Sequence, residues 1–77
     1  MSKLAPVSPR EFEKFLKFIG CTFIRQKGSH RVFTRSGLIR PIIVPCHSGD
    51  LPTFVVRNNL RLLNISIEDY QDILSRM

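Results

Sequence analysis

The sequence predicts an α+β fold in which two helices cover one face of a three-stranded antiparallel sheet, with a short helix at the end of the chain. Three observations lead to this prediction. Two segments carry apolar residues at helical spacing, and they flank a stretch that alternates like β-strands. That stretch is divided by a Gly-Ser pair and a Ser-Gly pair, both suited to tight turns. Finally, both helices have an apolar stripe, and the two stripes can be buried together only on the same sheet face.

We expect residues 1–77 to form one domain, because a chain this short buries only roughly 60% of its unfolded surface. Its composition, 43% hydrophobic and 23% charged, is typical of a globular protein. No stretch approaches the ~18 apolar residues of a membrane span, and residues 1–10 lack the apolar segment of a signal peptide. We therefore expect a cytoplasmic protein without a membrane partner.

The first helix is expected to run from Pro9 to about Ile19. Ser8 can cap its first turn, and Glu11 stands where a capping box needs it. Gly20 can adopt the left-handed conformation that follows a helix end. The residues at i, i+3, i+4 and i+7 form the stripe that should be buried, namely Phe12, Phe15, Leu16 and Ile19.

Residues 21–27 and 30–35 are expected to form two strands joined by a two-residue type II′ turn, in which glycine supplies the positive φ. This turn places Lys27 directly opposite His30, with their Cβ atoms about 5 Å apart. An ammonium group and an imidazole would therefore stand side by side at a strand end.

An unbroken register pairs Ile24 with Phe33, and we expect that face of the sheet to be the core. The other face would then carry Phe23, Arg25, Lys27, His30, Val32 and Thr34. A β-bulge or a longer turn would reverse this assignment.

The third strand is expected over residues 38–44, where Pro41 favours an edge position because it has no N–H to donate. The strand over 30–35 is then central. After a loop over residues 45–52, a second helix should run from Pro52 or Thr53 to Leu63. Asn64 can end this helix, and Ser66 can cap a last helix from Ile67 to about Ser75.

The charge distribution indicates a polyanionic partner. Twelve Lys and Arg side chains stand against six Asp and Glu, which gives a net charge of +6 and a pI near 10.2. Residues 1–61 hold eleven basic and three acidic side chains, or +8, whereas residues 62–77 hold one and three, or −2. We therefore expect RNA or another nucleic acid to bind the first part of the chain.

His30 is the candidate catalytic residue. Histidine exchanges protons near neutral pH, and a base that deprotonates a ribose 2′-hydroxyl lets that oxygen attack the neighbouring phosphate. Arg25 and Lys27 share its face in the expected register and could stabilise the phosphate charge. Arg31 and Arg35 would take this role only if the faces were reversed.

His47 is a candidate for the second proton transfer, to the departing 5′-oxygen. Four residues could formally bind zinc, namely Cys21, His30, Cys46 and His47. We expect no metal site, because adjacent Cys46 and His47 are awkward ligands for one tetrahedral ion. The cysteines lack a CxxC spacing and are expected to be reduced structural thiols rather than nucleophiles.

Several short motifs closely resemble the HicA toxins (YcfA-like), small mRNA interferases of bacteria and archaea. The motifs are Gly20-Cys21, then Arg25-Gln26-Lys27-Gly28-Ser29-His30, Val44-Pro45-Cys46-His47, Leu51-Pro52 and Asn64-Ile65-Ser66. The likeness covers nearly the whole chain. Two positions depart from it, since the family usually has Phe in place of Cys21 and commonly Gly-Thr in place of Phe54-Val55.

The resemblance implies a fold like the double-stranded-RNA-binding domain, α-β-β-β-α, and an endoribonuclease that needs no metal or other cofactor. It also implies inhibition by a HicB-like antitoxin that covers the active site. The family's catalytic histidine corresponds to His30, preceded by Gly28 and Ser29. We thus expect RNA contacts from Arg25, Lys27, Gly28, Ser29, Arg31 and His47. The alternative is an RNA-binding module of the same fold without catalysis, which reads RNA by shape.

Overall fold

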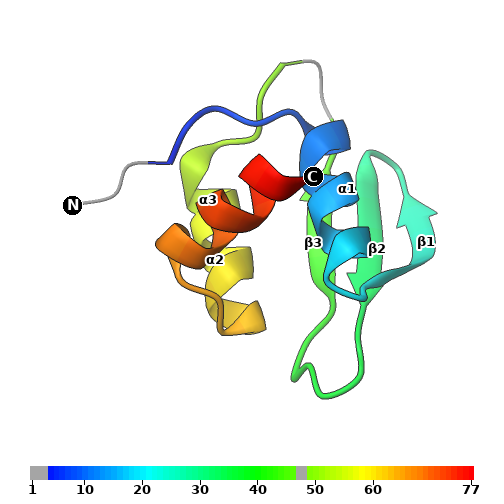
Figure 1. The fold of residues 1–77 in the computed structure, drawn as a ribbon. Coiled ribbons are helices and arrows are strands. Elements are labelled where there is room, and N and C mark those ends of the chain that lie inside the picture. Colours follow the sequence, from blue (N-terminus) through cyan, green and yellow to red (C-terminus); the bar gives the residue numbers. More distant parts are fainter. Residues whose placement is uncertain (1–3, 47–48) are drawn as a thin grey trace.

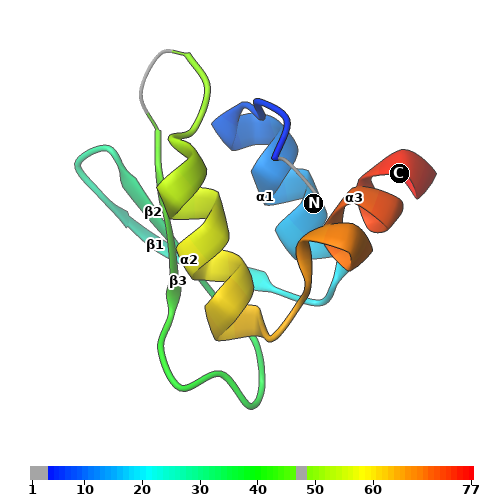
Figure 2. The same ribbon diagram turned by 90° about the vertical axis from the view of Figure 1, so that its left-hand side faces the viewer.

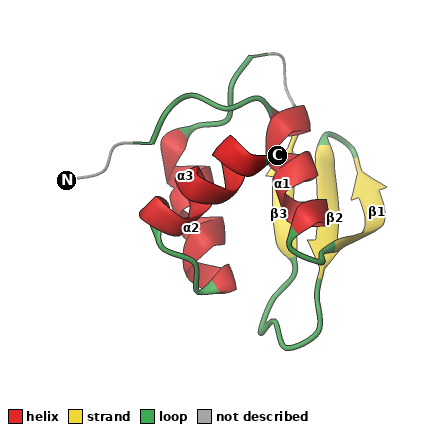
Figure 3. Ribbon diagram, in the orientation of Figure 1, coloured by secondary structure: helices red, strands yellow, loops and turns green. Residues whose placement is uncertain are grey.

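The fold contains three helices and a three-stranded antiparallel sheet, as expected for the α+β class (Figures 1 and 3). It is a computed structural model that describes residues 4–46 and 49–77. The elements follow the order α1 (Pro9–Phe18), β1 (Thr22–Lys27), β2 (His30–Thr34), β3 (Ile42–Pro45), α2 (Thr53–Leu63) and α3 (Ile67–Arg76). This order agrees with a fold like that of the double-stranded-RNA-binding domain.

Local sequence signals set the ends of α1. The Ser8 hydroxyl accepts a hydrogen bond from the Glu11 N–H, and the Glu11 carboxylate accepts one from the Ser8 N–H, which completes the capping box. At the other end Gly20 has φ 95°, and the Cys21 N–H donates to the Leu16 carbonyl at 2.8 Å. The predicted start and end of the first helix are confirmed.

The sheet has the strand order β1-β2-β3, so β2 is central as expected. Lys27 pairs with His30 across the first turn. Gly28 has φ 60°, and Ser29 is not among the residues with positive φ, which fits the expected type II′ turn. The side chains at the turn therefore follow the predicted register.

Further along β1 the predicted register is wrong. A β-bulge falls between Phe23 and Arg25, so that Phe23 rather than Ile24 pairs with Phe33. The extra residue places Phe23 on the same face as Phe33, with their ring centres 5.7 Å apart, and leaves Ile24 outside the core. Both side chains of this edge strand stay partly exposed, Phe23 at 43% and Ile24 at 45%. Arg25 remains on the face where it was expected.

The third strand is shorter than predicted. It begins at Ile42 instead of residue 38, because Pro41 cannot donate to the ladder, and the preceding residues form a turn in which the Leu38 N–H bonds the Arg35 carbonyl at 3.2 Å. Pro41 therefore precedes the edge strand instead of lying within it.

Two helices, α1 and α2, cover one face of the sheet, and α3 lies on their far side (Figure 2). The covered face contributes Phe33, Ile42 and Val44, which are all 0% exposed. Helix α3 joins the core through Tyr70, whose ring lies 4.8 Å from the Phe15 ring in an edge-on contact. No described segment covers the opposite face of the sheet (Figure 2). We call it the open face.

Candidate functional site

The candidate site lies at the end of the sheet where β2 begins, β3 ends and α2 begins (Figure 1). His30 is the first residue of β2 and is exposed on the open face. It is flanked in the sheet by Lys27 of β1 and Pro45 of β3. The sequence therefore predicted correctly that an imidazole and an ammonium group flank the turn.

Two hydrogen bonds fix the turn that precedes His30. The Gln26 side-chain amide donates to the Gly28 carbonyl at 2.9 Å. The Cys46 backbone N–H donates to the Ser29 carbonyl at 2.6 Å. Both turn carbonyls are thus occupied, and the backbone that carries the imidazole is held from within the hairpin and from β3.

A chain of polar contacts continues from this turn to α1. The Arg31 guanidinium donates to the Gln26 side-chain oxygen at 3.1 Å and to the Glu13 carboxylate at 2.8 Å. The Cζ atom of Arg31 also lies 4.3 Å from the centre of the Phe23 ring, in a cation–π contact. Arg31 therefore links the helix layer to the residue that braces the turn.

The predicted RNA-binding residues separate into two groups. Arg25 and Lys27 are exposed and share the open face with His30, and no ion pair joins either of them to another described residue. Arg31 projects from the opposite face, toward Glu13. His47 lies outside the described residues. The structure thus brings Arg25 and Lys27 together with His30, and places Arg31 apart from them.

Acidic side chains are absent from the elements around His30. The six acidic residues are Glu11 and Glu13 of α1, Asp50 of the loop before α2, and Glu68, Asp69 and Asp72 of α3. The whole sheet and α2 therefore carry basic charge without acidic charge. An anion that approaches the open face meets only attractive charges from these elements.

A cleft of about 260 Å³ lies beside His30, between β3 and α2. Its walls are His30, Ile43 and Pro45 from the sheet and Phe54, Val55, Asn58 and Asn59 from α2. The Asn59 amide donates to the Ile43 carbonyl at 3.1 Å, which fastens α2 along the edge of β3. This contact holds the two walls at a fixed separation.

Phe54 and Asn58 were not recognised from the sequence as site residues. They stand at i and i+4 on α2, off the buried stripe, and Phe54 is 64% exposed. An aromatic residue outside the apolar stripe of a helix was the available signal, together with Arg57 and Arg61 on the same solvent side.

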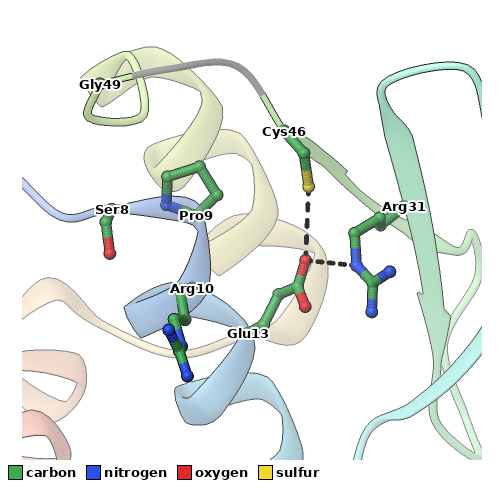
Figure 4. A pocket seen from close by; sticks show the side chains of 7 residues that line it. All are labelled: Ser8, Pro9, Arg10, Glu13, Arg31, Cys46 and Gly49. Atoms are coloured by element: carbon green, nitrogen blue, oxygen red, sulfur yellow. Dashed lines mark hydrogen bonds and ion pairs between the residues drawn. The ribbon is translucent and has the colours of Figure 1, made fainter.

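A larger hollow of about 460 Å³ lies between α1 and the other face of the sheet (Figure 4). There the Cys46 thiol and Arg31 both point toward the Glu13 carboxylate, and the sulfur lies 3.6 Å from its oxygen. Burial raises the pKa of the Cys46 thiol, and the hydrogen bond to Glu13 and its charge raise it further, whereas Arg31 opposes them. The thiol is therefore a poor nucleophile at neutral pH, and Glu13 is already engaged.

Within residues 4–46 and 49–77, no group of three or more His, Cys, Asp or Glu side chains is placed to hold a metal ion. Both cysteines are free thiols, and Cys21 is buried. The helices of the described chain are too short or too polar to cross a membrane.

Comparison with known protein families identifies a match that covers most of the chain. The family described as the HicA toxin of bacterial toxin-antitoxin systems matches residues 9–65. That range contains α1, the complete sheet and α2, and therefore His30 and both walls of the cleft. No curated protein matches the chain.

Proposed function

The chain belongs to the HicA toxin family, and on this premise we propose that it is an endoribonuclease toxin that cleaves mRNA in the cytoplasm without a metal ion. One observation carries the proposal. The His30 imidazole is exposed on a face whose elements hold cations and no acidic residue, and histidine is the side chain that commonly serves as a general acid or base. That combination suits an anionic substrate with a reacting phosphate.

In the proposed reaction, His30 removes the proton of a ribose 2′-hydroxyl. The 2′-oxygen forms a bond to the adjacent phosphorus, and the bond from phosphorus to the 5′-oxygen breaks. The departing oxygen takes a proton from a second acid, for which His47 is the candidate. Arg25 and Lys27 face the charge that builds on the non-bridging oxygens. The products are a 2′,3′-cyclic phosphate and a 5′-hydroxyl end.

The turn around His30 supports this role, because a general base acts only when it is held in position. Gly28 and Ser29 each present a carbonyl that is already hydrogen-bonded, so the backbone before the imidazole has little freedom. We propose that these two residues shape the approach of the RNA backbone to His30.

We further propose that the protein is neutralised by a HicB-type antitoxin that covers the open face. The family assignment supports an antitoxin partner in general, and the uncovered basic surface supports this position. If a HicB-like protein is encoded beside this gene, it should co-purify with the toxin and block RNA cleavage when added to it.

The test uses RNA incubated with purified protein in EDTA. We expect cleavage with cyclic-phosphate ends, and a loss of about 10²–10⁴-fold in rate in His30→Ala. Because His30 is exposed, the free energy of unfolding of this variant should differ from that of the wild type by less than about 0.5 kcal/mol. His47→Ala retains the base, His30, and removes the candidate acid. Its pH–rate profile should therefore lose the fall in rate at alkaline pH that deprotonation of the acid causes.

Cleavage by His30→Ala at the wild-type rate would remove His30 from the mechanism. Intact RNA after prolonged incubation with the wild type, together with salt-sensitive binding, would instead favour the RNA-binding module without catalysis.

A further inference from the structure

We propose that the cleft between β3 and α2 receives one unpaired base of the RNA, stacked on Phe54 and read by Asn58. These two residues would thereby set the preference for the cleavage site. The inference rests on the proposed ribonuclease function, because it assigns the base that neighbours the reacting phosphate.

The position of the cleft brings it next to the reacting phosphate. His30 forms part of the cleft wall, so a ribose and phosphate that react at its imidazole bring an attached base to the same place. The base must belong to one of the two nucleotides that flank the cleaved bond. His30 lines this cleft and does not line the hollows around Glu13, Asn64 or Leu74.

The size and lining of the cleft suit a single base. The cleft volume, about 260 Å³, lies below the range of about 300–1,000 Å³ of drug-sized sites and suits a single planar heterocycle. Phe54 is 64% exposed and Ile43 is 47% exposed, so apolar surface stands unburied on both walls. Bases of single-stranded RNA are bound by stacking on such aromatic side chains.

The Asn58 side-chain amide is available to a ligand. No hydrogen bond joins the Asn58 side chain to another described residue, whereas its neighbour Asn59 is engaged with the Ile43 carbonyl. An amide offers a donor and an acceptor side by side, the pattern that the edges of bases present. Asn58 can therefore discriminate between bases, whereas stacking on Phe54 cannot.

Charge favours a nucleic acid over an apolar peptide in this cleft. Arg57 and Arg61 are exposed on the same helix, Lys27 is paired with His30, and α2 and the sheet hold no acidic residue. Cations around an apolar cleft fit a base whose sugar and phosphate lie outside it.

The experiment uses DNA oligonucleotides that contain a single ribonucleotide, which can be cut only at the one 2′-hydroxyl. Sixteen substrates combine each of the four bases on one side of that bond with each of the four on the other. For the wild type we expect kcat/KM to depend on the base at one of the two positions. In Asn58→Ala this dependence should flatten, and Asn58→Asp, which loses the donor, should change the order of preferred bases.

Phe54→Ala should lower kcat/KM by about tenfold to a hundredfold for every base at the selected position. Phe18→Ala is the matched control, because this ring is 60% exposed on α1 and does not line the cleft. It should cleave at the wild-type rate. Thermal unfolding of each variant checks that the fold is intact.

Binding separates this inference from the proposed function. All-DNA versions of the same oligonucleotides cannot be cut, and their affinity is measured by fluorescence anisotropy. One outcome is that the wild type cuts no substrate, while Phe54→Ala and Asn58→Ala weaken base-dependent binding. Cleavage is then refuted and the base site stands. If the wild type cuts RNA and both variants keep its rate and base preference, the base site is refuted and the proposed function stands.

Discussion

Two consecutive residues of β2, His30 and Arg31, lie on opposite faces of the sheet and differ in their contacts. The Arg31 guanidinium is held by Glu13, Gln26 and the Phe23 ring. His30 is exposed on the open face, beside Lys27. On the covered face the polar groups serve the structure, whereas on the open face they remain available to a ligand.

Charge alone therefore does not identify a binding residue. Arg31 and Lys27 are both cations within three residues of the turn, yet the carboxylate of Glu13 lies 2.8 Å from Arg31, and no described carboxylate pairs with Lys27. The side of the sheet determines the role, and the register determines the side. Variants on the two faces should therefore differ in what they damage.

The largest expected effect is on stability, from the centre of the covered face. Phe33→Ala removes a ring that is 0% exposed and should cost about 3–5 kcal/mol in the free energy of unfolding. Ile24→Ala is the contrasting change, because the bulge leaves Ile24 45% exposed, and it should cost less than about 1 kcal/mol. Urea unfolding followed by circular dichroism measures both. Equal losses would mean that the bulge does not form in solution.

The next largest effect distinguishes Arg31 from Lys27. Arg31→Ala leaves the Glu13 carboxylate, whose side chain is 13% exposed, without its cation and should destabilise the fold by about 1–3 kcal/mol. Lys27→Ala should change stability by less than about 0.5 kcal/mol. It should also reduce the slope of log affinity for RNA against log salt by about 0.7, the value of one phosphate contact on a single strand.

The salt slope also tests Arg31 as an RNA ligand. If Arg31→Ala lowers the slope as much as Lys27→Ala does, Arg31 binds phosphate in spite of its contacts with Glu13. An unchanged slope with lower stability would confine Arg31 to the covered face.

The smallest effect concerns Tyr70, whose hydroxyl is the buried polar side-chain atom without a hydrogen-bond partner among the described residues. Tyr70→Phe should raise stability at neutral pH by about 1 kcal/mol or less, because it removes a group that loses its water on folding. Urea unfolding of this variant at neutral pH measures the gain, and a loss would reveal a partner for the hydroxyl.

The pH dependence of Tyr70 provides a second measurement. Burial, and secondarily the Glu11 carboxylate, raise the pKa of Tyr70 to about 12. Its pKa in the unfolded chain is about 10. The folded state therefore favours the neutral phenol, and stability should be lost as pH rises from about 10 toward 12. The chain has one tyrosine and no tryptophan, so ultraviolet absorbance reports this titration alone. A native midpoint near 10 would contradict the burial.

Much of the fold follows from local sequence signals. Ser8 with Glu11, Gly20, and Ser66 each specify a helix end that the structure has. The pairing of β1 with β2 follows from a two-residue turn, and the buried stripes follow from periodicity. The connection from β2 to β3 spans residues 35–41 and is longer than the predicted tight turn. The bulge at Ile24 does not follow, because either register of β1 would satisfy the alternation, and the choice depends on how Phe23 packs against Phe33 and Arg31.

The candidate site was predictable to the extent that it is local. Lys27 and His30 are brought together by a two-residue turn, so their pairing can be derived from the sequence. Phe54 and Asn58 reach His30 only through the packing of α2 along β3, across more than twenty residues of intervening chain. Contacts of that kind depend on tertiary structure, which no local pattern encodes.

The bulge also affects how related sequences should be aligned with this one. Counted back from the turn, Lys27 and Arg25 lie on the same face of the sheet as His30. Beyond Ile24 the alternation is inverted, so that Phe23 lies on the covered face. An alignment that places a gap at Ile24 would preserve both faces, whereas a gap elsewhere in β1 would exchange basic and aromatic positions. Substitution patterns in relatives should therefore be compared separately on the two sides of this residue.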